Sequence, residues 1–391
     1  DYNINDLISQ LSILIDVWNF LVHFNGFFGS NFNIDSLLSS AIKECILLYK
    51  DDEAKTENNF IKILEKLVAH SKDNFTRILH KDYLSDKSFP FLWKYIDGNV
   101  YITKIGENVD KIEVGDKVIA LDSIPIERFI DSISKFVGFS SDNWKILKSL
   151  AYIRNFFPND TLKLTLMKSN GKIVNKTVYK DFESNQIYED RPEKFQLLSN
   201  KIVYFDLTRL VDKEIKDILD TLSSKDYFIF DLRGIALTSE QFLRLFTDKT
   251  IECNAWKIPV YAFPFKQKIS WQTIRLKING KSLFNPKGTY FLIDERTIGL
   301  AELIADIAKR YKIGTLVGST TGGNPMEFSS KIFPNGLTLY FSVLRVFSCD
   351  GEDKYRKSIV PNIPVKIRPN KDALLRDQIL DKAISLINSN Q

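Results

Sequence analysis

The sequence is poor in the residues that build metal centres and disulfide frameworks. It has three cysteines and three histidines in 391 residues, and it contains no HExxH pattern. Cys45, Cys253 and Cys349 lie far apart and are odd in number, so one pair at most can form a disulfide, and the sequence leaves that pairing open. We therefore predict no metal site and no cofactor.

Long apolar runs and long runs of one charge are also missing. We find no apolar run that approaches the ~20 residues of a membrane-spanning helix. The 54 Lys and Arg are scattered among 49 Asp and Glu, for a formal charge of +5. This pattern is typical of a mildly basic solvated surface and argues against nucleic acid as a partner. The chain starts at Asp1, so the compartment is not readable from its beginning.

What is present is an ordinary globular composition, with 44% hydrophobic and 26% charged residues. The length indicates two or three domains. Three stretches carry apolar residues at helical spacing: residues 2–22, a second that starts near Asp35 and a third that starts at Thr56. We predict a helical N-terminal domain over residues 1–90.

After Gly98 the sequence pattern changes from helical spacing to short strands. Short strands surround a helical segment in residues 98–182, and Ser169-Asn170-Gly171 is a hairpin turn signal. From residue 195 to 391, apolar strands alternate with amphipathic helices, as in an α/β domain. The sequence thus predicts an α+β multidomain protein: a helical domain, a compact module and a strand–helix core with a C-terminal helix.

Five motifs then follow one another in a fixed order: VGDKVIALDSIPI (114–126), YFIFDLRG (227–234), RTIGLAELIA (296–305), VGSTTGG (317–323) and IVPNIPV (359–365). In this order they resemble the tail-specific (C-terminal processing) serine peptidase family, which includes the tricorn core and the retinoid-binding repeats. The resemblance implies a PDZ-like module at 98–182 and a ββα (crotonase/ClpP-like) peptidase-type core at 195–391.

The resemblance places the nucleophile and the base on residues that cannot react. In RTIGLAELIA the family's serine falls on Gly299, with Thr297 and Glu302 in frame. The histidine of the family's turn falls on Phe75 in AHSKDNFTR. Glycine cannot attack a carbonyl and phenylalanine cannot accept a proton. His70 lies nearby, but a lone histidine at a helix end is usually structural.

The position of the orienting carboxylate, near Arg356, carries cations instead. Arg356 and Lys357 follow Tyr355, and Glu352 stays open as a substitute. Two cations there would repel a positively charged imidazolium, which the orienting carboxylate is meant to stabilise. Another branch of the family uses a lysine base, but Lys309 is expected to be a solvated residue in the last turn of its helix.

The oxyanion site is expected at the backbone of Leu300 and at Gly234. In the family a glycine pair follows the core strand, whereas this chain has Ala236, Leu237 and Thr238 there. A side chain at these positions restricts the close backbone approach that glycine allows.

Three hypotheses follow. The first is a catalytically inactive homologue that binds a peptide or a protein C-terminus by strand addition, or a small apolar ligand in a roomy former active site. The cleft candidates are Phe75, Gly299, Thr320, Thr321 and Gly322. The third is a purely structural subunit. The resemblance implies a bacterial protein in the periplasm, on the surface or secreted.

The second hypothesis is an active serine-type peptidase with a relocated nucleophile. Its candidate hydroxyls are those of GSTTGG, and its candidate carboxylates lie elsewhere along the chain. The residues are Ser319, Thr320 and Thr321 with Glu302, Glu327 or Asp73.

Overall fold

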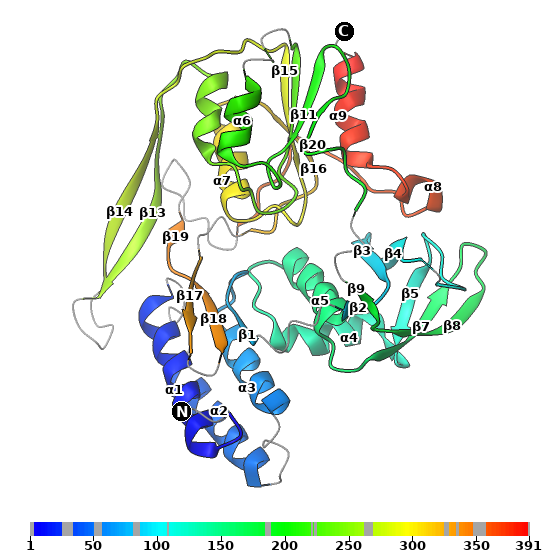
Figure 1. Cartoon of the computed structure of the whole chain (residues 1–391), viewed down its shortest axis with the longest axis vertical. Coiled ribbons are helices and arrows are strands. Elements are labelled where there is room, and N and C mark those ends of the chain that lie inside the picture. Colours follow the sequence, from blue (N-terminus) through cyan, green and yellow to red (C-terminus); the bar gives the residue numbers. More distant parts are fainter. Residues whose placement is uncertain are drawn as a thin grey trace.

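The computed structural model describes most of the chain in three groups of elements (Figure 1). The described residues are 4–25, 34–50, 57–80, 87–107, 109–183, 189–219, 222, 225–261, 269–323, 328–333, 336–346 and 357–389. The N-terminal helices, the strand-rich module and the α/β core meet around the middle of the molecule.

The N-terminal part is helical, as predicted. It consists of α1 (Leu7–Phe24), α2 (Ile34–Lys50) and α3 (Glu57–Ala69). Its hydrophobic core is completed by a three-stranded sheet of order β1-β18-β17, built from β1 (Arg77–His80), β18 (Leu337–Ser342) and β17 (Phe328–Ile332). The helices therefore share their core with two strands that lie far from them in the sequence.

Helix α1 is apolar enough, by length and composition alone, to cross a membrane. The sequence analysis found no such run. Ile13, Leu14, Val17 and Leu21 of this helix are buried in the core that it shares with α3 and β18. A core helix passes the same test, so α1 is weak evidence for a membrane span.

The module that follows is a sheet of order β3-β4-β5-β7-β8, with β6 paired to β5. The strands and helices predicted for it are confirmed, including the turn, where Gly171 has a positive φ of 81°. Its elements are β2 (Lys87–Ser88), β3 (Phe91–Ile96), β4 (Asn99–Ile105), β5 (Lys117–Leu121), β6 (Ile124–Pro125), α4 (Ile126–Ile133), η3 (Ser134–Phe136), α5 (Asp142–Phe156), β7 (Thr161–Met167), β8 (Ile173–Tyr179) and β9 (Phe182–Glu183).

The core is a six-stranded sheet of order β10-β11-β12-β15-β16-β20, parallel except for β10. Helix α7 and the C-terminal α9 contribute to the apolar clusters that cover the sheet. The elements are β10 (Phe195–Leu197), β11 (Ile202–Asp206), α6 (Asp212–Leu219), β12 (Tyr227–Asp231), η4 (Glu240–Phe246), β15 (Gly288–Ile293), α7 (Leu300–Arg310), β16 (Thr315–Gly318), β20 (Ile363–Pro364), α8 (Lys371–Leu374) and α9 (Gln378–Ser389).

Three features of the core differ from the sequence prediction. The segment from Thr238 forms a 3₁₀ helix, η4, rather than an α-helix. The predicted closing helix breaks into α8 and α9, because the Asp377 carboxylate accepts the Leu380 N–H and caps α9. A long hairpin of β13 (Ile251–Tyr261) and β14 (Ile269–Ile278) was not predicted, and β19 (Arg345–Val346) pairs with it.

The cysteines behave differently from one another. Cys45 is a free, buried thiol, whereas Cys253 on β13 is disulfide-bonded. Cys349 lies outside the described residues.

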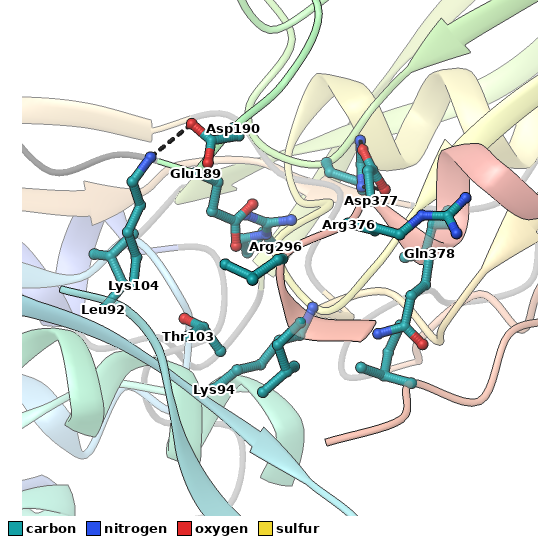
Figure 2. A pocket seen from close by; sticks show the side chains of 15 residues that line it. Leu92, Lys94, Thr103, Lys104, Glu189, Asp190, Arg296, Arg376, Asp377 and Gln378 are labelled. Carbon is teal, nitrogen blue, oxygen red and sulfur yellow. Dashed lines mark hydrogen bonds and ion pairs between the residues drawn. The ribbon is translucent and has the colours of Figure 1, made fainter. Parts of the chain in front are cut away.

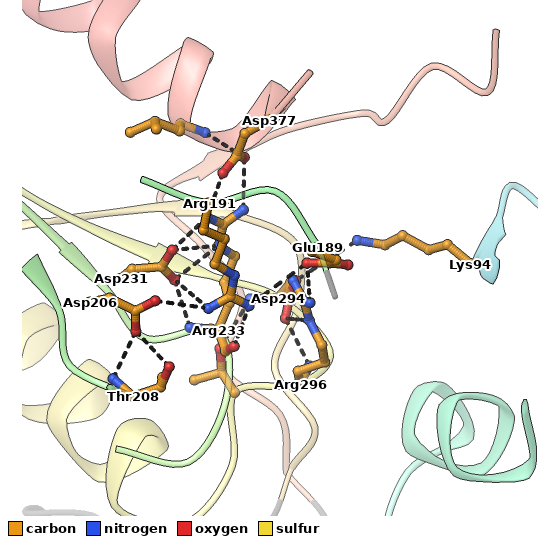
Figure 3. A network of polar contacts seen from close by, with 12 residues as sticks. Lys94, Glu189, Arg191, Asp206, Thr208, Asp231, Arg233, Asp294, Arg296 and Asp377 are labelled. Atoms are coloured by element: carbon orange, nitrogen blue, oxygen red, sulfur yellow. Dashed lines mark hydrogen bonds and ion pairs between the residues drawn. The ribbon is translucent and has the colours of Figure 1, made fainter. Parts of the chain in front are cut away.

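The carboxyl ends of the parallel strands carry a buried charge network (Figure 3). Asp231 is the last residue of β12, and its carboxylate forms an ion pair with the Arg233 guanidinium. Arg233 also makes a bidentate pair with Asp377, at 2.8 and 2.6 Å. Burial by itself raises the pKa of the Asp231 carboxyl, but the Arg233 guanidinium holds that pKa well below its usual range. Arg233 thus joins a central strand to the start of α9.

The same network reaches the other module. Lys94 on β3 lies 3.3 Å from a carboxylate oxygen of Glu295, and Arg296 pairs with Asp294 and with Glu189 of the connecting segment. The strand-rich module is therefore tied by charge to the loop that follows β15.

Replacing Arg233 with Met should strongly destabilise the fold. The change leaves Asp231 and Asp377 without their shared cation in a buried place, and breaking such a pair costs about 3–5 kcal/mol. The free energy of unfolding, measured with a denaturant, is expected to fall by this amount. Arg376→Met is the matched control, because Arg376 is exposed and pairs with Asp381 at the surface. Equal losses in both variants would contradict the role given to Arg233.

A second group of ionisable residues, which are partly buried, lies between α3 and α5. The Tyr152 hydroxyl donates to Glu65 at 3.0 Å, and burial raises the pKa of Glu65 to about 7. Burial likewise lowers the pKa of Lys148 to about 8. Its ammonium group donates to the carbonyls of Asn74 and Gly138, at 3.1 and 3.0 Å.

Glu65 should make stability fall as the pH rises from about 4.5 to about 7. In that window the unfolded chain has released the Glu65 proton, whereas the folded chain still holds it. Glu65→Gln is therefore expected to flatten the fall in unfolding free energy over this window. Tyr152→Phe removes a hydrogen bond that lowers the pKa of Glu65 and should move the fall to higher pH. An unchanged pH profile in Glu65→Gln would contradict this assignment.

Candidate functional site

Gly299 lies at the turn between β15 and α7 with a backbone that suits glycine. Its φ and ψ are 62° and −133°, and it precedes the first residue of α7. Residues with a Cβ are strained in this region, at a cost of about 1–3 kcal/mol. The position thus has the sharp turn that exposes a nucleophile in many hydrolases, but it has no side chain.

Phe75 lies in an apolar cluster beside this turn. Phe75 and Ile298 are 7% and 2% exposed, and Trp144 and Trp256 pack against them. The Phe75 ring also stacks on Phe328, with the ring centroids 5.1 Å apart. These side chains pack against one another next to Gly299, and the roomy apolar pocket stays a prediction.

The Asp73 carboxylate builds the turn that carries Phe75. It accepts hydrogen bonds from the backbone N–H groups of Phe75 and Thr76, at 2.8 and 2.7 Å, and from the Thr76 hydroxyl. Asn25 and Ser342 each add a side-chain donor at 3.0 Å. With this many donors, Asp73 is occupied in fixing the turn and is not placed to orient a base.

Glu302 and Thr321 likewise act on each other. Glu302 is buried in the first turn of α7 and accepts from the Thr321 hydroxyl and from the Gly323 N–H. The Thr321 oxygen in turn accepts from the Ile359 N–H at 2.7 Å. This set of hydrogen bonds gives Glu302 a structural role, because it ties the start of α7 to the segment after β16.

The Gly322 carbonyl joins three parts of the chain at the site. It accepts from the side chains of Asn74, Ser140 and Ser141, at 3.2, 3.2 and 2.8 Å. A Cβ on Gly322 would lie 2.4 Å from the Ile298 side chain, so only glycine fits. Sequence reasoning missed Ser140 and Ser141, although Ser141 before α5 is a typical N-cap.

The two oxyanion positions lie on either side of the turn. The Gly234 carbonyl accepts from the Ile298 N–H at 3.4 Å, and Ile235 forms a parallel bridge with Ile298. Leu300 begins α7, where backbone N–H groups lack partners within the helix. Leu237 is largely exposed, and its N–H donates to Leu207. An oxyanion site at Leu300 and Gly234 stays a prediction, and the glycine pair of the family is missing from this chain.

Other predicted residues lie away from the turn or beyond the described chain. The Lys309 ammonium group donates to the Val360 carbonyl at 2.7 Å. Thr320 lies in the segment that follows β16. Arg356, Glu352 and Glu327 fall outside the described residues. In the part of the chain that the structure describes, no group of three or more His, Cys, Asp and Glu could hold a metal ion.

Ser319 is the one predicted hydroxyl that meets a partly buried carboxylate. Its hydroxyl donates to Glu295 at 3.0 Å, on the carboxylate that also faces Lys94. A carboxylate can orient a serine, but it is a much weaker base than histidine at neutral pH.

A cavity of about 130 Å³ opens between the strand-rich module and the core (Figure 2). Charged side chains line it, and they are paired: Lys104 with Asp190 at 2.6 Å, and Arg233 with Asp377. Ion pairs therefore line this cavity, and none of its lining residues is a nucleophile next to a base.

Comparison with known proteins identifies both modules. Residues 85–194 match the PDZ domain, and residues 247–365 match peptidase family S41. A search of curated proteins gave no match.

Solved structures show the same fold over almost the whole chain. Mature CPAF is 13% identical over 97% of each chain, with a TM-score of 0.75, and mature CPAF complexed with lactacystin is 12% identical, with coverages of 97% and 98% and a TM-score of 0.74. The photosystem II D1 C-terminal processing protease is 13% identical over 94% of this chain and 97% of its own, with a TM-score of 0.50. At these identities the likeness is one of fold. The chain thus has a PDZ domain ahead of a peptidase family S41 domain, and in this order it is similar to the tail-specific serine peptidases that its motifs resemble.

Proposed function

We propose that this chain is a catalytically inactive member of its peptidase family and that it acts by binding an extended peptide. The observation that carries the proposal is the pair of Gly299 and Phe75, which stand where the nucleophile and the base are expected. The residues around them support it, because Asp73 and Glu302 are both fully engaged in fixing loops. A PDZ domain and a peptidase fold favour a peptide as the ligand.

A small apolar ligand is a weaker candidate. Phe75 and Ile298 are buried by aromatic neighbours, so a ligand beside them would have to displace Trp144 or Trp256. A peptide, by contrast, needs only a free strand edge and pockets for alternate side chains.

The alternative is an active hydrolase with a relocated nucleophile. The contact between Ser319 and Glu295 is the observation that favours it. Thr321 is a poorer candidate, because its buried hydroxyl is held between Glu302 and the Ile359 N–H.

We also propose that the protein works outside the cytosol. The disulfide at Cys253 supports this location, since disulfides persist mainly in oxidising compartments.

The first test is cleavage of a disordered protein and of a peptide library during long incubation, read by mass spectrometry. The purified chain should cleave neither above the buffer background, and Ser319→Ala should behave in the same way. Ser329→Ala, on the exposed strand β17, is the control variant. Cleavage that disappears in Ser319→Ala but persists in Ser329→Ala would replace our proposal with the relocated nucleophile.

Restoring the two missing side chains should not restore activity. In Gly299→Ser with Phe75→His, the imidazole would enter an apolar cluster and the serine would adopt a strained backbone. We expect no cleavage above either single variant. The strain at Gly299→Ser should lower the unfolding free energy by about 1–3 kcal/mol. Turnover by the double variant alone would show that an orienting group survives and would count against an inactive frame.

A further inference from the structure

A peptide would add to the PDZ domain between α5 and the edge strand β3, and we call this place the groove. Among the described strands β3 is the edge of its sheet and pairs with β4 only. Helix α5 lies alongside it (Figure 1), and the Trp93 indole N–H donates to the Leu150 carbonyl at 3.2 Å. Extended peptides bind PDZ domains by adding a strand to such an edge.

The loop before β3 has no backbone donor left for a carboxylate. The Phe89 N–H donates to the Arg154 carbonyl at 3.1 Å, Pro90 has no N–H, and the Phe91 N–H donates to the Phe89 carbonyl at 2.9 Å. Terminal carboxylates are ordinarily captured by successive backbone N–H groups in a concave loop. In this loop the N–H groups of Phe89 and Phe91 already have partners, so they are not available to a ligand carboxylate.

The Arg154 guanidinium lies at the same place, and it is buried without a counter-ion. Arg154 is 8% exposed. Its Nε donates to the Phe91 carbonyl at 2.9 Å and its Nη1 to the Asn155 side chain at 3.1 Å. Its Nη2 is buried and has no hydrogen-bond partner in the described structure, and no described carboxylate pairs with it. Burial alone lowers the pKa of this group.

A purely structural role explains only part of this arrangement. A cation near the C-terminal end of α5 complements the helix dipole, and the bond to Phe91 ties the helix to β3. Neither accounts for a buried N–H group that is left without an acceptor, which is costly in the absence of a ligand. The guanidinium presents a planar fork of donors that matches a carboxylate.

We propose that Arg154 receives a carboxylate group of a bound peptide in the groove between α5 and β3, in place of the backbone N–H groups that the loop has used. The inference rests on the proposed peptide-binding function and names the chemistry of the ligand. The carboxylate comes from a chain end or from an Asp or Glu side chain. Because Nη2 is covered, the groove is closed in the free chain, and binding must move α5 or the Arg154 side chain. Such a movement also frees the Phe91 carbonyl for a peptide N–H.

The test uses the full chain, immobilised, and two random heptapeptide libraries, one with free C-terminal carboxylates and one amidated. Retained peptides are quantified by mass spectrometry. We expect at least about tenfold preference for the free carboxylates, the scale of one charge-assisted hydrogen bond. Arg154→Met should abolish the preference. Lys145→Met should keep it, because Lys145 lies on the same helix but pairs with Asp131.

Each outcome decides a separate point. If the peptides retained from the amidated library are enriched in Asp and Glu, and Arg154→Met removes this enrichment, the carboxylate belongs to a side chain. Equal retention of both libraries without such enrichment, or a preference that survives Arg154→Met, overturns the inference and leaves peptide binding intact. Retention of neither library defeats the proposed function itself. Arg154→Lys keeps the cation without the fork and should give a reduced preference; it decides the point if thermal melting shows that Arg154→Met does not fold.

Discussion

The buried pairing of Arg233 with Asp231 and Asp377 is the interaction on which the centre of the molecule depends. It lies where the parallel strands end, and it fixes the last helix to a central strand. The loops that carry Gly234 and Gly299 leave the sheet at this same edge. Charges around it extend through Arg296 and Lys94 to the PDZ domain, so one network sets the relative positions of both modules (Figure 3). Such pairs are costly to bury and costlier to break, which makes this edge rigid.

The candidate site lies beside that rigid edge. There the turn at Gly299 and the start of α7 at Leu300 adjoin the segment that carries Gly234. The polar side chains that remain hold loops together: Asp73 holds the turn of Phe75, and Glu302 the exit of β16. A glycine in the sharp turn releases strain that a serine would carry. Glycine at this position therefore favours the stability of the turn.

Much of the fold could be predicted because its signals are local. The near-continuous apolar run Tyr227–Asp231 predicts a strand, and the helical spacing around Leu303 predicts a helix. The hairpin of β13 and β14 could not, because Pro259 and scattered charges interrupt its alternation and its pairing is not a local property. At the site, sequence reasoning placed Gly299 and Phe75 on adjoining segments. It could not show that aromatic rings pack against Phe75 and Ile298, nor that Nη2 of Arg154 has no hydrogen-bond partner among the described residues, since both depend on packing between segments distant in the chain.

The pairing of β1 with β18 joins two strands that lie far apart in the chain. His80 lies opposite Leu337, and the core of the N-terminal helices contains Phe333, Leu339 and Phe341. During synthesis the helices emerge well before the strands that complete their core. The apolar faces of the N-terminal helices therefore stay uncovered until β18 has been made. The helices and β18 complete their shared core together, so a chaperone or a protected compartment would matter most to this protein in that interval.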